Sequence, residues 1–478
     1  MQQALHIFKK DVRYLRLEIG IVLALALSLT WTERHPGQWL AETLFTLAAC
    51  ALIARLVHEE AIPGDNQFWV TRPYRWESLL GAKLAFIVLF VSVPLLLEQF
   101  FLAKYLGFSP STFWPGLLWC QALILLCVIL PVTAMAALTP GITSFISFAL
   151  VLMGLELVTN TELRVLFDFP RPGQPAVEAE GFGSVEWVRS SIALAGAALI
   201  SSGVLYAQYR GRRTSFSRWF AITAGVVFAS AYFFLPWTAA LKFEGMLSKR
   251  SFDASVLSLE LDPKTADQLR GQRKVLPGQT MVILPMVIRG ASRDLELRTD
   301  AVSVSIQGEG GRTWTSGLRG ISPGRMESGG LFSSVVLLID PSFYREVSEK
   351  PSTFHAKVYL TLLGDAESSS IPVDPKGANA IEGLRCSTNF MDQVACSSAF
   401  RWPARGIYAA FTSWAGEPFT TSFSYSPFPA VIGFTPFEEH WVSTPKDATT
   451  VKIIAKKPLS HFERDFEVQG VRLDAFRY

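Results

Sequence analysis

Seven long apolar segments occupy the first half of this sequence, and they limit the folds it can adopt more than any other feature. Their approximate bounds are Leu17–Trp31, Trp39–Val57, Ala82–Leu102, Pro115–Ala136, Gly141–Val158, Ser190–Ala207 and Trp219–Trp237. A helix needs roughly 20 residues to cross a bilayer, so we expect each segment to be a membrane span, the first being the shortest. Residues 17–241 are therefore predicted to form a helical membrane domain.

The residues before the first span predict an amphipathic helix that lies on the membrane surface over residues 1–16. Apolar side chains recur there at spacings of three and four residues, and basic side chains accompany them: Leu5, Phe8, Val12 and Leu15, with Lys9, Lys10, Arg13 and Arg16. A signal peptide is the alternative. The apolar run 21–30 is followed by Trp31-Thr32-Glu33-Arg34 without a small-residue cleavage pattern, which favours a retained first span.

The positions of lysine and arginine predict which side of the membrane each loop faces. With a cytoplasmic N-terminus, twelve basic residues near the spans face inward, namely Lys9, Lys10, Arg13, Arg16, Arg55, Arg72, Arg75, Lys83, Arg210, Arg212, Arg213 and Arg218. Five face outward: Arg34, Lys104, Arg164, Arg171 and Arg189. Basic residues are retained on the cytoplasmic side, so this orientation is favoured. An odd number of spans then places residues 250–478 outside the cytoplasm.

Residues 250–478 form a second region, and its sequence pattern predicts an all-β fold. Short β-rich runs alternate with turns rich in Gly, Pro and Ser, which is typical of one or two antiparallel sandwiches. A region of this size is large for one sandwich, and a division near residues 364–379 is plausible.

Two of the five cysteines, Cys386 and Cys396, lie ten residues apart in this β region. In an extracytoplasmic domain such a pair predicts a disulfide, whereas two unpaired buried thiols are the alternative. A zinc site is less favoured, because no second Cys or His pair lies nearby.

The sequence carries no catalytic motif that we recognise. It has no Gly-x-x-x-x-Gly-Lys-Ser/Thr phosphate loop and no Gly-x-Ser-x-Gly elbow, and His58-Glu59-Glu60 lacks the second histidine of a helical zinc site. The net charge of +3 is too small to indicate nucleic-acid binding. Two carboxylates inside predicted spans, Glu98 and Glu156, are candidate functional groups. Both lie near the outer ends of their helices, so the alternative is solvation among the headgroups.

The loop between the second and third spans is the best candidate site. Phe68, Trp69, Trp76 and Leu79 could line one side of a short helix, with Arg72 and Arg75 directed outward. Such a segment suits docking into a groove of a soluble partner. Alternatively, its aromatic residues anchor at the interface and its arginines only set topology.

This loop, Pro63-Gly64-Asp65-Asn66-Gln67-Phe68-Trp69-Val70-Thr71-Arg72-Pro73 continued by Leu79-Leu80-Gly81-Ala82-Lys83-Leu84, resembles the loop after the second span of ABC transporter permeases of the type-2 export class. The basic segment Lys9-Lys10-Asp11-Val12-Arg13 is similar to the elbow helix of that family. The resemblance covers about residues 1–240. It implies that a separate ATPase subunit is contacted by Asn66, Phe68, Trp69, Arg72, Pro73 and Arg75.

The resemblance further implies that ATP and Mg²⁺ are bound by the partner ATPase, and that two permease halves pair, either as two copies or with a homologous chain. A typical half has six spans, whereas we count seven here, followed by a large external β region. We therefore expect a multi-pass permease subunit of an exporter in a bacterial-type cytoplasmic membrane, not an enzyme in itself. The alternative is a membrane-anchored extracytoplasmic binding or sensory module without transport.

Overall fold

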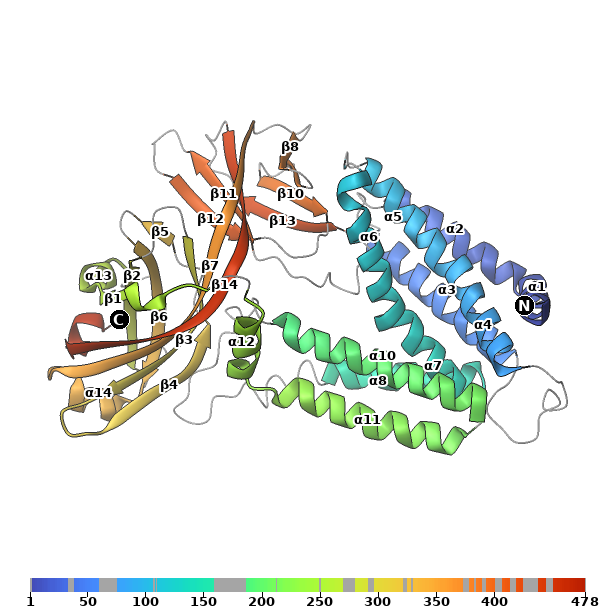
Figure 1. Cartoon of the computed structure of the whole chain (residues 1–478), viewed down its shortest axis with the longest axis horizontal. Coiled ribbons are helices and arrows are strands. Elements are labelled where there is room, and N and C mark those ends of the chain that lie inside the picture. Colours follow the sequence, from blue (N-terminus) through green and yellow to red (C-terminus); the bar gives the residue numbers. More distant parts are fainter. Residues whose placement is uncertain are drawn as a thin grey trace.

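The computed structural model of the chain has a helical region and a β region at opposite ends of its longest axis (Figure 1). The N-terminal helix lies at the far end of the helical region, and the C-terminus lies at the far end of the β region. The structure describes residues 2–32, 38–59, 75–105, 108, 110–158, 186–211, 213–248, 251–269, 280–290, 296–320, 325–327, 330–372, 378–381, 384–388, 393–399, 406–412, 418–423, 437–443 and 450–477.

All seven predicted apolar segments are helical. The helices are α1 (Gln2–Tyr14), α2 (Arg16–Thr32), α3 (Gln38–His58), α4 (Trp76–Ile87) continuing into α5 (Val93–Tyr105), α6 (Pro110–Ile124) continuing into α7 (Leu130–Leu138), α8 (Ile142–Val158), α10 (Glu186–Gly211), α11 (Thr214–Phe234) and α12 (Trp237–Met246). Among the described residues, four helical stretches are long and apolar enough to cross a bilayer: Leu40–His58, Trp76–Tyr105, Phe113–Leu138 and Val188–Gly211. The chain is therefore a membrane protein. A count of seven spans stays a prediction.

Two of these stretches contain a wider, π-helical turn immediately before a proline. The turns are Val88–Ser92 between α4 and α5, and Leu125–Ile129 between α6 and α7. Pro94 and Pro131 follow them within two residues. Proline has no N–H to donate to the carbonyl four residues earlier, and its ring collides with that carbonyl in a regular α-helix. The wider turn relieves this collision, so each helix continues past its proline.

Helices α10 and α11 pack closely because α10 has glycines on the shared face. A Cβ atom at Gly196 would lie 2.6 Å from the ring of Phe228, and one at Gly203 would lie 2.7 Å from the ring of Phe220. The α11 aromatic rings therefore rest directly on the α10 backbone, as small residues allow between membrane helices.

The described residues of the β region form three antiparallel sheets, and the sequence predicted antiparallel strands here. One sheet has the order β1-β2-β6-β5, a second β12-β11-β14-β7-β3-β4, and a third β13-β10-β9-β8. The strands are β1 (Ser258–Leu261), β2 (Thr280–Arg289), β3 (Glu296–Gln307), β4 (Thr313–Gly320), β5 (Arg325–Glu327), β6 (Gly330–Ile339), β7 (Ser352–Pro372), β8 (Ala378–Ile381), β9 (Leu384–Thr388), β10 (Gln393–Ala399), β11 (Gly406–Thr412), β12 (Pro418–Phe423), β13 (Phe437–Ser443) and β14 (Thr450–Val471). Two short helices, α13 (Pro263–Leu269) and α14 (Pro341–Val347), accompany them.

The first two sheets enclose one hydrophobic core. Alternate positions of β2, such as Val282, Leu284 and Met286, are fully buried and pack with residues of β3, β6 and β7, including Phe354. This follows from the period of two in a strand, which directs every second side chain to the same face.

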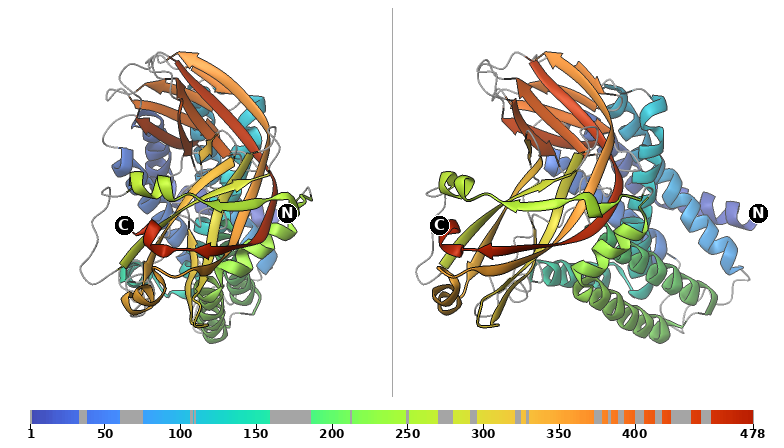
Figure 2. Two further views of the ribbon diagram at one scale, coloured as in Figure 1. Left: turned by 90° about the vertical axis from the view of Figure 1, so that its left-hand side faces the viewer. Right: turned by 60° about the vertical axis from the view of Figure 1, so that its left-hand side comes forward.

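Strands β7 and β14 are long and pair with each other over most of their length. Strand β7 runs to Pro372, into the predicted division at residues 364–379, and its sheet holds strands from before and after that division. Figure 2 shows these two strands curving from the first sandwich toward the strands β9 to β13. A division of residues 250–478 into two separate sandwiches stays a prediction.

Helix α12 joins the helical region to the β region. It lies between α10 and the strands in Figure 1. Ala240 and Leu241 of α12 form a small buried cluster with Val188 of α10, Ala301 of β3 and Tyr359 of β7. The two regions therefore share a packed apolar contact.

Candidate functional site

The N-terminal helix α1 is fixed to α4 by a buried ion pair. Lys83 Nζ lies 2.9 Å from Asp11 Oδ2, and neither side chain is exposed. Burying two charges is unfavourable unless they are paired with good geometry, and removing one partner of such a pair is strongly destabilising. The position of α1 on α4 is therefore closely specified. The predicted surface helix is present, but it packs on protein as well as facing outward.

Aromatic packing and one hydrogen bond reinforce this contact. The ring of Phe8 in α1 lies 6.1 Å from both Phe86 and Phe90, measured between centroids. The backbone N–H of Arg75, which precedes α4, donates to Gln3 Oε1 at 3.3 Å. The first turn of α4 is thus tied to α1 at the point where the loop from α3 ends.

Most of the predicted ATPase-contacting residues fall outside the described residues. Asn66, Phe68, Trp69, Arg72 and Pro73 belong to this group, so their role stays a prediction. Arg75 is described, and it is exposed.

The end of α3, the end of α7 and the start of α11 contact one another. His58, at the end of α3, lies 3.0 Å through Nε2 from the carbonyl oxygen of Ala136 and 3.1 Å from Thr139 Oγ1. Arg218 of α11 donates through Nη2 to the carbonyl oxygen of Leu138 at 2.9 Å. Arg218 thereby satisfies a carbonyl in the last turn of α7, whereas the carbonyl of Ala136 also accepts from the N–H of Thr139 at 3.3 Å. The ends of α3 and α7 and the start of α11 therefore form one connected surface.

Of the two intramembrane carboxylates, the structure describes the side chain of Glu98 but not that of Glu156. Glu98 of α5 is 7% exposed and so faces the protein interior. Its neighbour Gln99 is fully buried and accepts a hydrogen bond at 2.9 Å from Gln121 of α6. Glu156 lies in α8, but its side chain is outside the described residues. A functional role for either carboxylate stays a prediction.

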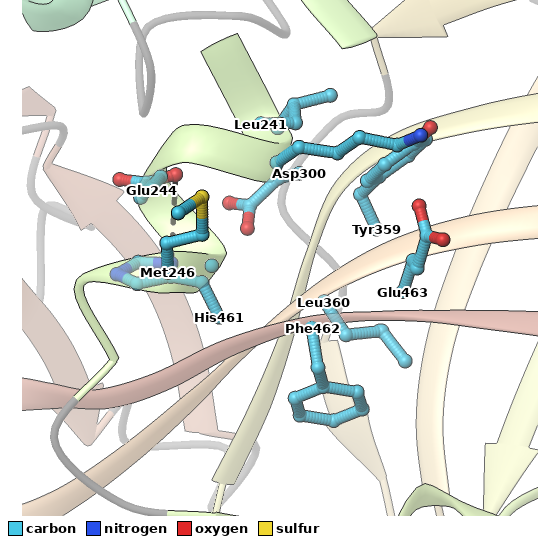
Figure 3. A pocket seen from close by; sticks show the side chains of 11 residues that line it. Leu241, Glu244, Met246, Asp300, Tyr359, Leu360, His461, Phe462 and Glu463 are labelled. Atoms are coloured by element: carbon cyan, nitrogen blue, oxygen red, sulfur yellow. Dashed lines mark ion pairs between the residues drawn. The ribbon is translucent and has the colours of Figure 1, made fainter. Parts of the chain in front are cut away.

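A cavity of about 440 Å³ lies where α12 meets the β region. Its lining includes Leu241, Glu244 and Met246 from α12, Asp300 from β3, Tyr359 and Leu360 from β7, and His461 and Phe462 from β14 (Figure 3). The lining is mostly apolar, with a few polar groups that converge on its wall. Cavities of this kind and size are the usual places for small ligands.

Three strands and α12 contribute to a polar network beside this cavity. His461 Nδ1 lies 2.8 Å from Thr361 Oγ1 and 3.6 Å from Glu244 Oε2. The Thr361 hydroxyl donates to Asp300. Asp300 in turn pairs with Arg298, whose Nη2 lies 2.9 Å from Oδ1. Because the threonine hydrogen is given to Asp300, Nδ1 of His461 is the donor toward threonine.

Burial is the main influence on His461. It lowers the pKa of the imidazole below its usual 6.5; Asp300 opposes this shift, and Arg298 reinforces it. The histidine is therefore neutral at pH 7. Glu244 is 5% exposed, so both members of the Glu244–His461 contact are largely removed from solvent.

Sequence reasoning missed this network. Glu244 and His461 are 217 positions apart in the numbering, and no motif connects them. The sequence offered one signal, Glu244 itself, a carboxylate just beyond the last predicted span in a stretch, Trp237–Leu247, whose other charged residue is Lys242.

The predicted disulfide gains support from strand register. Antiparallel pairing of β9 with β10 places Cys386 directly opposite Cys396. Cys386 is buried, and the side chain of Cys396 is outside the described residues. Among the described cysteines, Cys50, Cys120 and Cys127 are free. The Cys386–Cys396 bond itself stays a prediction.

Comparison with known proteins identifies no family for this chain. The chain matches no protein-family model, and it matches no curated protein sequence. No group of three His, Cys, Asp or Glu side chains able to hold a metal ion occurs among the described residues.

Proposed function

We propose that this chain is the membrane permease subunit of an ABC-type exporter and that a separate ATPase subunit binds the loop between α3 and α4. The observation that carries the proposal is the buried Asp11–Lys83 pair, which fixes a basic N-terminal helix to α4 beside that loop. A loop that transmits the movement of an ATPase must be attached rigidly to the membrane helices. The ion pair provides this attachment, because it fixes α4, which follows the loop, to α1.

The arrangement of helix ends supports the proposed orientation. The end of α3, the start of α4, the end of α10 and the start of α11 lie at the end of the helical region that is farther from the β region (Figure 1). These are the segments beside which the predicted inward-facing basic residues gather. With this end in the cytoplasm, the N-terminus is also cytoplasmic and the β region is extracytoplasmic.

The proposed mechanism uses the partner as the source of energy. ATP and Mg²⁺ are bound by the partner ATPase, because this chain has no phosphate loop. Closure of the ATPase displaces Phe68, Trp69 and Arg72, and the displacement passes through α4 and α1 to the membrane helices. These helices then shift between two arrangements, as expected for a ligand-biased two-state transition. A second permease half, either a copy or a homologue, completes the pathway.

A second candidate is a membrane-anchored extracytoplasmic binding or sensory module. The observation that favours it is the cavity of about 440 Å³ between α12 and the sheets, which lies on the β-region side of the helices. This candidate requires no ATPase, and the experiment below separates the two.

The decisive experiment is purification of the tagged chain from detergent-solubilised membranes, followed by identification of co-purifying chains and measurement of ATP hydrolysis. We expect an ATP-binding cassette subunit in near-equal amount with the wild type. The triple substitution Phe68→Ala, Trp69→Ala and Arg72→Ala should abolish its retention.

The control is Arg289→Ala, which changes an exposed arginine of β2 that pairs with Glu260. It should retain the ATPase at the wild-type level. Unchanged retention by the triple variant would exclude the loop as the ATPase contact. Absence of any ATPase from wild-type preparations that still bind a ligand through the β region would favour the second candidate.

A further inference from the structure

The cavity of about 440 Å³ has one wall from α12 and one from the large sheet (Figure 3). The C-terminal half of α12 contributes the apolar side chains of Leu241 and Met246. On the sheet, Tyr359 of β7 pairs in register with Glu463 of β14, so their side chains lie on the same face, which is the face toward α12. Met246 is 83% exposed and Leu241 is 6% exposed, so the cavity extends from the surface to buried side chains. A small molecule can therefore enter it from solvent.

A β-bulge places an acidic side chain in the sheet wall. The pairing of β3 with β7 is irregular between Thr299 and Ala301, and Asp300 lies at this irregularity. Bulges redirect a side chain, and they are common beside functional sites. Asp300 is 5% exposed and lines the cavity. The sheet wall thus presents two carboxylates, those of Asp300 and Glu463, to the cavity.

Glu244 presents a third carboxylate from the opposite wall, in the last turn of α12, which has no basic residue. The C-terminal end of a helix is the negative end of its dipole, so a carboxylate is unfavourable there and a cation is favourable. Glu244 is 5% exposed, so water screens its charge weakly. Its neighbour His461, with Nδ1 3.6 Å from Oε2, is held neutral at pH 7 by burial. A positive group brought beside Glu244 would therefore be stabilised by both the carboxylate and the helix end.

The charges that face the cavity also favour a cation. Among the described residues that line it, three carry carboxylates, and Lys242 is the one lysine or arginine. Two of the carboxylates are paired with basic residues outside the lining: Asp300 with Arg298 at 2.9 Å, and Glu463 with Lys357 at 3.0 Å. These pairs belong to the sheet wall itself. We therefore assign the contact with a ligand to Glu244, on the α12 wall.

We infer that this cavity binds a small organic cation, an ammonium group that carries a compact apolar body. The ammonium group lies at Glu244, and the apolar body lies against Leu241, Met246 and the ring of Tyr359. An aromatic ring attracts a cation through its negative face, which adds to the charge contact. The inference goes beyond the proposed function, because it holds whether or not an ATPase binds the loop between α3 and α4. It also names the class of ligand that the second candidate function leaves open.

Three probes with the same apolar body separate the effect of charge from that of hydrophobicity: the cation 2-phenylethylamine, the neutral 2-phenylethanol and the anion 3-phenylpropionate. Binding is followed by NMR of the full chain in lipid nanodiscs, with ¹³C-labelled methionine methyl groups. The resonance of Met246 is identified by its loss in Met246→Leu, and the other methionines report any effect of probe dissolved in the lipid. We expect a saturable shift of the Met246 resonance with the amine, and an affinity roughly tenfold or more lower for the alcohol and the anion.

Variants assign the ammonium contact to its residue. Glu244→Gln should weaken binding of the amine by roughly tenfold or more. The matched control Glu346→Gln should leave it unchanged, because Glu346 is 41% exposed on α14, pairs with Arg312 and does not line the cavity.

A second variant keeps the test valid if Glu244→Gln disturbs the fold. Lys242→Gln removes the lysine from the lining and should tighten binding of the amine by roughly two- to fivefold, which damage to the fold would not do. Equal affinities for the three probes, no saturable shift with the amine, or unchanged amine affinity in Glu244→Gln would each overturn the inference. The measurement involves no ATPase, so none of these results would bear on the proposed contact between the loop and an ATPase.

Discussion

Replacing Lys83 with methionine removes the positive charge from a pair in which neither side chain is exposed. The carboxylate of Asp11 then remains in the protein interior without the ammonium group 2.9 Å away. Breaking a buried ion pair by removing one partner typically costs about 3–5 kcal/mol. We therefore expect Lys83→Met to lower the free energy of unfolding by about that amount, equivalent to a roughly 150- to 5,000-fold change in the folding equilibrium.

The assay is an unfolding titration of the purified chain with SDS in mixed micelles, followed by circular dichroism. Lys104→Met is the matched control, because Lys104 is exposed at the end of α5 and its loss should change stability by less than about 0.5 kcal/mol. The double variant Asp11→Leu/Lys83→Met should recover most of the loss, since apolar residues can replace a buried pair at little cost. Equal effects of Lys83→Met and Lys104→Met would refute the reasoning, as would a double variant no better than the single one.

Three further predictions concern other parts of the molecule. Gly196→Ala places a methyl group 2.6 Å from an α11 ring and should destabilise the α10–α11 contact by about 1–3 kcal/mol, whereas Gly225→Ala, with nothing within 4 Å, should be neutral or slightly stabilising in the same titration. Asp340 accepts hydrogen bonds at the start of α14, chiefly from Ser342, and these lower its pKa below 3.8. Asp340→Ala should therefore destabilise the β region near pH 7, and the difference from wild type should shrink as the pH falls from 3.8 through the lowered pKa. Thiol labelling of denatured, unreduced protein should miss Cys386 and Cys396, whereas labelling of both would disprove the bridge, which closes a short loop worth roughly 2–3 kcal/mol.

The helical segments could be predicted from sequence because lipid imposes a simple requirement. A long apolar run such as Trp39–Val57 must satisfy its backbone groups internally, so a helix is the only structure available to it. The π-helical turns before Pro94 and Pro131 could also have been anticipated from the missing proline N–H. The pairing of Asp11 with Lys83 could not be predicted. In the sequence, each residue looks like an ordinary charged residue near the membrane surface.

The strands were predictable as strands, but the sheets were not. One of the β-rich runs, Thr280–Arg289, coincides with β2, since its apolar and β-branched residue types favour a strand. Sheet order depends on pairing between distant segments, and β14 pairs with β7 at sequence separations of 78 to 119 residues. For the same reason the contact between Glu244 and His461 cannot be derived from any short stretch of the sequence.

The central claim is that the loop between α3 and α4 and the β region lie on opposite sides of the membrane. Single cysteines introduced at Trp69 and at Lys350, an exposed position after α14, can be tested with a membrane-impermeant maleimide in intact and permeabilised cells. Our account predicts that Lys350→Cys is labelled in intact cells and that Trp69→Cys is labelled only after permeabilisation. Labelling of Trp69→Cys in intact cells, or labelling of both positions under the same condition only, would contradict it.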